Sequence, residues 1–355
     1  MAVSPHLARL ASRGRPAGST AAEEARSYCA TILGNAGFVV DEQRFEYSIV
    51  AGAWGTPVGG VVGALGGIGL YLGRRSPALS AASILMLAAT GLILRYLSGR
   101  GMLELHAWRR PGVNLQACRP GLSPTIWLVA HIDSKWQPVS MLARIAGVVV
   151  LTVGLSGLFV AVVTRVSGHE GLAAGLLLMT WLGASPLMLS IVGSKNDGAL
   201  DNASGLAAVL QAAEEIPRTV PVGVLITDAE ELGLAGARAW VRGRAPGVAI
   251  NCDSIDDVGM LTIMYSGAAP SALIARLRHA AFGIGERVRV IRLIPGILTD
   301  HVPLARAGWQ TLTLSRGDLR TLRRVHTARD TLEFMDGVGV SGAARVLALS
   351  ATELG

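Results

Sequence analysis

Four long stretches without a charged side chain limit the folds open to this chain more than any other feature does. They occupy residues 47–73, 76–94, 145–164 and 171–194, and each is at least 19 residues long. A helix of about 20 apolar residues spans the hydrocarbon core of a bilayer, at about 1.5 Å per residue. Short polar turns at residues 74–75 and 165–170 join the stretches in pairs. The pattern predicts two transmembrane hairpins.

The composition agrees with that prediction. Hydrophobic residues make up 51% of the 355 positions and charged residues only 16%, and the mean hydropathy is +0.46. A long buried helix would explain any one apolar stretch, but four of them in two pairs are typical of membrane spans. We therefore expect an integral, multi-pass protein of a bacterial cell membrane, with the lipid bilayer as a partner.

The first apolar stretch carries glycine at every fourth position, at Gly59, Gly63 and Gly67. These three glycines form one small face of a helix, and such faces let helices pack closely in lipid. The face predicts close packing either against another span of the same chain or against a second copy in a homo-oligomer.

Several features bear on compartment and partners. The first 45 residues contain no apolar segment typical of a cleavable signal peptide. The three cysteines, Cys29, Cys118 and Cys252, have no metal-binding spacing. The net charge of +7 suits the neighbourhood of anionic lipid heads, and no motif accompanies it that would indicate nucleic acid as a partner.

The basic residues near the spans bear on orientation. Basic residues that flank the spans on the domain side outnumber those in the turns. The domain-side residues are Arg44, Arg100, Arg109, Arg110, Lys135, Arg144 and Lys195, against Arg74, Arg75 and Arg165 in the turns. The positive-inside rule therefore favours a cytoplasmic domain. The acidic flank before the first span argues for the opposite orientation.

Outside the hairpins, strand-like and helix-like stretches alternate. The predicted strands cover residues 38–49, 102–110, 113–119, 125–130, 220–227, 247–252, 260–266, 287–293 and 310–315. The predicted helices cover residues 20–37, 202–216, 236–243, 270–282 and 336–353. Apolar strands alternating with helices predict an α/β domain with a central, mainly parallel or mixed sheet flanked by helices. We expect this domain at residues 20–50, 100–140 and 195–355, interrupted between strands by hairpins at residues 51–98 and 142–194.

Acidic residues and histidines follow the predicted strands. His131 and Asp133 follow the strand at 125–130, Glu230 and Glu231 follow the strand at 220–227, and Asp253 follows the strand at 247–252. Asp201 opens a helix, and His301 and His326 come later in the chain. Each residue has an ordinary alternative as a helix cap, a core histidine, a turn former or a solvated acid. Together, at the carboxyl ends of strands in one sheet, they favour a metal site with nitrogen and oxygen ligands.

The ordered set of motifs around these residues resembles a known family. "HIDS", "DNASG", "EELGLAG", "NCDS", "DHVPL" and "VHTARDT" are similar to the zinc exopeptidases that include bacterial leucyl aminopeptidases, glutamate carboxypeptidases and glutaminyl cyclases. The resemblance covers the chain outside the hairpins. Relatives commonly have aspartate before the "DNASG" aspartate, whereas this chain has Leu200, a position that is not a bridging ligand.

The resemblance implies the zinc exopeptidase fold, two zinc ions per chain and a division of roles. His131 and Asp253 would hold one zinc ion, and Glu231 and His326 the other. Asp201 would bridge both ions. Glu230 would be the general base, and Asp133 would orient His131.

We therefore expect a membrane-integrated di-zinc exopeptidase of the aminopeptidase type. It would hydrolyse peptide bonds of peptide or aminoacyl substrates through a metal-bridged water. One alternative is acyl transfer at a single zinc, as in glutaminyl cyclases. A second alternative is a non-catalytic membrane scaffold on a peptidase fold.

A cluster of arginines bears on substrate choice. Five arginines lie around His326 in "SRGDLRTLRRVHTARD", residues 315–330. They either rest on anionic lipid heads or grip an acidic group of the substrate. Arg323 and Arg324, together with His301, are the candidate substrate-binding residues.

Overall fold

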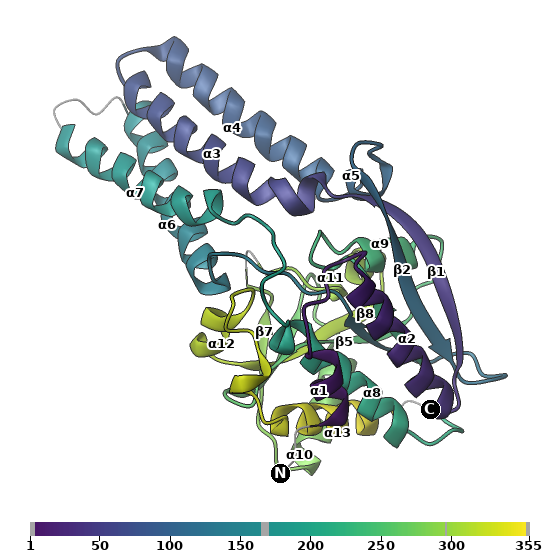
Figure 1. Cartoon of the computed structure of the whole chain (residues 1–355). Helices are drawn as coiled ribbons and strands as arrows, with labels where there is room; N and C mark the ends of the chain where they lie inside the picture. The colour runs from purple at the N-terminus through teal and green to yellow at the C-terminus, as the bar shows by residue number, and fades with distance from the viewer. Residues whose placement is uncertain (1–3, 165–169, 295–296, 353–355) are drawn as a thin grey trace. The chain divides into compact units, whose positions relative to one another are not determined.

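The structure, a computed structural model, describes residues 4–164, 170–294 and 297–352. The chain divides into two compact units. An α/β unit comprises Met1–Tyr47, Arg109–Trp136 and Gly193–Gly355, and a helical unit comprises Ser48–Trp108 and Gln137–Val192. Figure 1 labels most helices and strands of both units.

The α/β unit contains an eight-stranded mixed sheet with the strand order β1-β2-β4-β3-β5-β8-β6-β7. The strands are β1 (Val39–Ser48), β2 (Arg109–Cys118), β3 (Ile126–His131), β4 (Val222–Thr227), β5 (Val248–Ile255), β6 (Met260–Tyr265), β7 (Val288–Arg292) and β8 (Gln310–Gly317). The four central strands β4, β3, β5 and β8 are parallel, while β2 and β6 run antiparallel to β4 and β8. The predicted fold class is confirmed.

Helices cover both faces of this sheet. The helices of the unit are α1 (Pro5–Leu10), α2 (Thr20–Asn35), α8 (Gly205–Glu215), α9 (Ala235–Val241), α10 (Ser271–Gly283), α11 (His301–Arg306), α12 (Leu319–Arg324) and α13 (Val338–Thr352). Side chains of a strand alternate between faces. Trp127 and Val129 of β3 pack with Trp240 of α9 and Leu304 of α11. The alternate residue, Leu128, is fully buried on the face that α8 covers.

The helical unit contains α3 (Val50–Gly73), α4 (Pro77–Leu97), α5 (Gly101–Glu104), α6 (Met141–Val163) and α7 (Glu170–Met188). By length and composition, α3, α4, α6 and α7 are candidate membrane spans. Arg74 and Arg75 at the end of α3 pair with Glu170 at the start of α7, with N–O distances of 2.6 and 2.9 Å.

The small face of α3 packs against helices of the same chain. A Cβ atom at Gly67 would lie 2.6 Å from Thr180 of α7, and one at Gly63 would lie 3.1 Å from Leu151 of α6. A Cβ atom at Gly59 would lie 3.6 Å from Leu94 of α4. Close packing against other spans thus occupies these glycines, and the homo-oligomer stays a prediction.

Two boundaries differ most from those expected. Residues 101–104 are helical and the strand begins only at Arg109, so the strand predicted at 102–110 was wrong over residues 102–108. Leu103, Leu105 and Ala107 alternate with polar residues, the pattern typical of a strand, which explains the error. The last apolar helix ends at Met188 rather than near 194, two residues after Pro186.

Both hairpins are inserted between strands, and the chain closes each insertion with backbone hydrogen bonds. Trp136 and Gly193 donate to each other's carbonyl oxygens at 3.0 and 2.8 Å across the second insertion. Across the first, Ile49 N–H donates to the Trp108 carbonyl at 3.2 Å. The insertions therefore leave the strand pairing intact.

Candidate metal centre

The candidate site lies at the carboxyl ends of the central parallel strands. The chain runs from β3 to β4 on one side of β3, and then from β4 across to β5 on the other side. Open α/β sheets bind ligands at such a reversal of strand order. His131 ends β3, Asp253 lies near the end of β5, and Glu230 and Glu231 follow β4. The fold therefore gathers residues from three separate strand ends.

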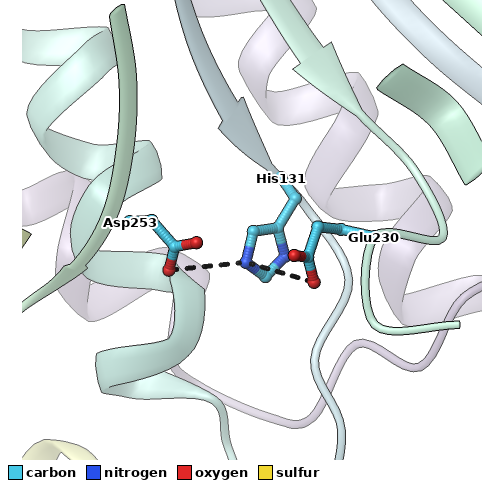
Figure 2. Close-up of side chains that lie close together, drawn as sticks. All are labelled: His131, Glu230 and Asp253. Atoms are coloured by element: carbon cyan, nitrogen blue, oxygen red, sulfur yellow. Dashed lines mark ion pairs between the residues drawn. The ribbon is translucent and has the colours of Figure 1, made fainter. Parts of the chain in front are cut away.

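His131 is the centre of one group of candidate ligands. Its imidazole is 1% exposed, and the oxygens of Asp253 and Glu230 lie 3.8 and 4.0 Å from its Nε2 atom. Figure 2 shows both carboxyl groups beside the ring, and one ligand atom from each of the three residues lies within 4.8 Å of the other two. An oxygen of Asp201 lies closer, at 3.1 Å. His131 Nδ1 lies 3.0 Å from the Asp133 carbonyl, and donation there leaves Nε2 with its lone pair free for a metal.

His326 is the centre of the second group. Its Nε2 lies 3.1 Å from Asp201 Oδ2 and 3.1 Å from Glu231 Oε1. Asp201 Oδ1 faces His131, so the two oxygens of this one carboxylate point to different histidines. All three side chains are buried. The arrangement is that of two ligand groups joined by one carboxylate.

The donor atoms fit metal ions. The Nε2 atoms of His131 and His326 and the Oε1 atom of Glu231 are buried and make no hydrogen bond. Buried polar atoms without partners are rare in folded proteins unless a ligand satisfies them. Two ligands of one tetrahedral zinc, at bond lengths of about 2.0–2.1 Å, lie about 3.3 Å apart. The 3.1 Å separations around Asp201 and His326 match that geometry.

Asp133 holds the paired glutamates rather than acting on His131 alone. Its two carboxylate oxygens accept the backbone N–H groups of Glu230 and Glu231 at 3.0 and 3.1 Å. Its Oδ1 lies 3.6 Å from His131 Nδ1. Asp133 therefore fixes the turn that carries both glutamates, a contact that its position two residues after His131 did not suggest.

Sequence reasoning missed Asp330, which holds the loop of Asp201. Its carboxylate is fully buried and accepts the backbone N–H groups of Leu200 and Asp201 at 2.5 and 3.2 Å. Burial, together with the nearby Asp201 charge, raises the pKa of Asp330 to about 7. The residue was inside the quoted "VHTARDT" motif, and its spacing from His326 was the available signal.

The electrostatics separate the two adjacent glutamates. Burial raises the pKa of Glu230 well above its usual value, and the Glu231, Asp300 and Asp253 charges add to this effect. Burial also disfavours the charged form of Glu231, but His326 and Lys135 outweigh it, so the pKa of Glu231 is lowered. Lys135 Nζ lies 2.7 Å from Glu231 Oε2. Adjacent carboxyls with opposite pKa shifts suit different roles.

The backbone around the site is unusual. Ala229, Ser254 and His326 have φ values of 55°, 56° and 65°, in the left-handed region that non-glycine residues rarely adopt. They lie next to Glu230, next to Asp253 and at a candidate ligand itself. Strained backbone of this kind concentrates at functional sites.

The candidate substrate-binding residues lie in different environments. His301 is fully buried, with Nδ1 2.6 Å from Thr299 Oγ1. Arg324 pairs with Asp256 at 3.4 Å and lies over the ring of Phe334. Arg323 is exposed. Their role in substrate binding stays a prediction.

A mixed sheet with two buried histidine–carboxylate groups at the ends of its parallel strands defines an α/β protein with a candidate metal centre. The model of peptidase family M28 matches residues 172–350, about half of the chain. The chain belongs to this family.

Solved structures agree in fold. A zinc aminopeptidase from Bacillus subtilis aligns with a TM-score of 0.58 at 14% identity, covering 98% of this chain and 93% of that chain. An aminopeptidase from Aneurinibacillus sp. strain AM-1 aligns with a TM-score of 0.56 at 12% identity, covering 97% and 91%. A glutaminyl cyclase from Bacteroides thetaiotaomicron aligns with a TM-score of 0.57 at 14% identity, covering 98% and 95%. No curated protein matches the sequence significantly. Family and fold together support a zinc hydrolase.

Proposed function

We propose that the chain is a membrane-integrated di-zinc exopeptidase of the aminopeptidase type. The observation that carries the proposal is Asp201, whose two oxygens each lie 3.1 Å from the Nε2 atom of a different histidine. Two divalent cations a few ångströms apart need such a bridging carboxylate to offset their repulsion. Membership of the M28 family and the likeness to zinc aminopeptidases support the same function.

The roles of the residues follow from this arrangement. His131 and Asp253 would hold one ion, and Glu231 and His326 the other, with Asp201 between them. When bound, the two ions would acidify a water and polarise the scissile carbonyl. Glu230 would accept a proton at its carboxylate and deliver it to the leaving amine. Its raised pKa supports this role, because a general base works best with a pKa near the working pH.

The roles of the two glutamates can be separated by substitution. Glu230→Gln should keep both metals and lose hydrolysis by about 10²–10⁴-fold, the usual contribution of a general base. Glu231→Gln should instead lose a metal. Metal content per chain and the hydrolysis of a panel of aminoacyl-amides measure both effects, with the exposed Glu215→Gln as the matched control. Full metal and full activity in both variants would refute this division of roles.

A second candidate function is cyclisation of N-terminal glutamine at a single zinc. The glutaminyl cyclases align with TM-scores similar to those of the aminopeptidases, and this similarity supports cyclisation as a second candidate. Release of ammonia from a peptide with N-terminal glutamine, with one metal per chain, would favour this candidate. Release of a free amino acid, with two metals per chain, would favour the peptidase.

The membrane part of the proposal rests on α3, α4, α6 and α7, which are long and apolar enough to span a bilayer. Each hairpin crosses twice, so the strands before and after it lie on one side. The excess of Lys and Arg beside the spans on the domain side favours the cytoplasm as that side.

A further inference from the structure

A buried lysine lies against the candidate ligands and has no role in the mechanism above. Lys135 is 9% exposed, and its ammonium lies 2.7 Å from Glu231 Oε2 and 3.3 Å from the Glu231 carbonyl oxygen. The Lys135 carbonyl accepts the side-chain N–H of Asn196 at 2.9 Å, which fixes the backbone at this position. The cation is therefore held in place rather than free to swing into solvent.

The pairing divides the Glu231 carboxylate between two partners. Oε2 faces the ammonium, while Oε1 lies 3.1 Å from His326 Nε2 and makes no hydrogen bond. Only Oε1 is thus available to the group of Asp201, Glu231 and His326. A positive charge also lies within a few ångströms of whatever cation this group holds.

The other group has a different charge environment. Asp253 and Glu230 have oxygens 3.8 and 4.0 Å from His131 Nε2, and their described ion pairs join them to that ring (Figure 2). The carboxyl groups there lie beside an imidazole, whereas Glu231 faces an ammonium. A cation should therefore bind more tightly beside His131 than beside His326, because like charges repel strongly at these distances.

We propose that Lys135 makes the two metal positions unequal, so that the ion held by Asp201, Glu231 and His326 binds more weakly and exchanges more readily than the ion beside His131. This inference rests on the proposed function, since it concerns the same two metals. It adds a way to regulate the protein, because the fraction of chains with an ion beside His326, and so with two ions, would depend on the concentration of free zinc.

Removal of the ammonium tests the inference. Lys135→Met keeps the length and the apolar stem of the side chain and removes its charge. Zn²⁺ is titrated into the metal-free full-length protein in detergent, in competition with a chromophoric chelator, and Co²⁺ absorption reports ligation independently. Wild type should show two unequal affinities, and Lys135→Met should tighten the weaker one by at least ~10-fold, the scale set by a unit charge near a divalent ion.

The controls separate this effect from damage to the fold. Lys195→Met removes an exposed lysine that lies over the Trp136 ring and should leave both affinities unchanged. A disturbed fold would weaken metal binding, so a gain in affinity cannot arise from misfolding. An unchanged or weaker second affinity in Lys135→Met overturns the inference.

The outcome for the proposed function can be read separately. If wild type and Lys135→Met each bind two ions with the same affinities, the two-metal function stands and the inference fails. If wild type binds one ion and Lys135→Met binds two, the inference stands and the two-metal function of the natural chain fails. One ion with equal affinity in both proteins overturns both.

Discussion

At the scale of single residues, His301 is a histidine that the fold keeps neutral. It is fully buried between Thr299 and Thr313, whose hydroxyls lie 2.6 and 2.7 Å from its Nδ1 atom. Burial lowers its pKa to about 4. In the unfolded chain the imidazole has a pKa of about 6.5. Folding therefore excludes a proton that the unfolded chain binds between these two values.

This difference predicts a pH dependence of stability. Above about pH 6.5 neither state protonates His301 and the stability is unaffected by this residue. As the pH falls towards 4, the unfolded state takes up a proton, and the free energy of unfolding should fall by about 3 kcal/mol, at about 1.36 kcal/mol per pKa unit. Denaturant unfolding of the metal-free protein at several pH values between 7 and 4 measures the loss.

His301→Gln decides this prediction, because its free energy of unfolding should lack the fall that His301 causes between about pH 6.5 and 4. The exposed His279→Gln is the matched control and should follow wild type. Parallel pH profiles for wild type and His301→Gln would show that another group is responsible. Metal-free protein is used because bound metal would add the protonation of its own ligands to the profile.

At the scale of elements, a segment that precedes the first strand reaches into the site. Arg15 is 1% exposed, and its guanidinium donates to the carbonyl oxygens of Ile132, Asp197 and Gly198 at 2.9–3.0 Å. Its backbone exchanges hydrogen bonds with Ser134 at 2.8 and 3.0 Å. Ile132 lies between His131 and Asp133, and Asp197 and Gly198 precede Asp201 in the chain. The Arg15 side chain therefore joins the two loops that carry these candidate ligands.

Arg15→Met should therefore weaken metal binding as well as the fold. Each buried carbonyl left without a donor costs about 1–3 kcal/mol. We expect metal affinity to fall by ~10-fold or more, as for partners that orient ligands from outside the coordination shell. Arg15→Lys should not restore it, because an ammonium cannot replace the planar fork of donors. Arg13→Ala, at an exposed neighbour paired with Glu24, is the control. An Arg15→Met protein with wild-type affinity would contradict this role.

The same elements explain what the sequence could predict. The buried strands were evident because β3 and β4 are apolar up to their last residue, and their ends marked His131, Glu230 and Glu231 without knowledge of the fold. The family resemblance then implied which of these residues bind metal and which one is the general base, and their positions after strands could not show this.

The contacts that hold those residues in place could not be predicted from the sequence. Arg15 lies 117 residues from Ile132, Lys135 lies 96 residues from Glu231, and Asp330 lies 129 residues from Asp201. Each contact exists only because the sheet order brings distant loops together. Local periodicity and charge give no signal for such pairs, which is why Lys135 was read only as a positive charge near the spans.

At the scale of the whole molecule, the strand order limits the topology in a membrane. The first hairpin lies between β1 and β2 and the second between β3 and β4, and both pairs are neighbours in the same sheet. A hairpin of two spans returns the chain to the side from which it left. If α3, α4, α6 and α7 cross the bilayer, the strands before and after each hairpin lie on one side and the turn after α3 lies on the other.

Labelling of introduced cysteines tests this topology in intact bacterial cells. Cys29 and Cys252 are buried, so Cys118→Ser provides a suitable background. Arg75→Cys lies in the turn after α3, where the side chain is 81% exposed, and Arg320→Cys lies on exposed α12 of the α/β unit. An impermeant maleimide should label Arg75→Cys in intact cells and Arg320→Cys only after permeabilisation, as the positive-inside rule requires for a cytoplasmic domain. The reverse pattern would assign the α/β unit to the outer side.

Release of the protein from membranes by alkaline washing would refute membrane insertion altogether, because four apolar helices that span a bilayer cannot be extracted without detergent.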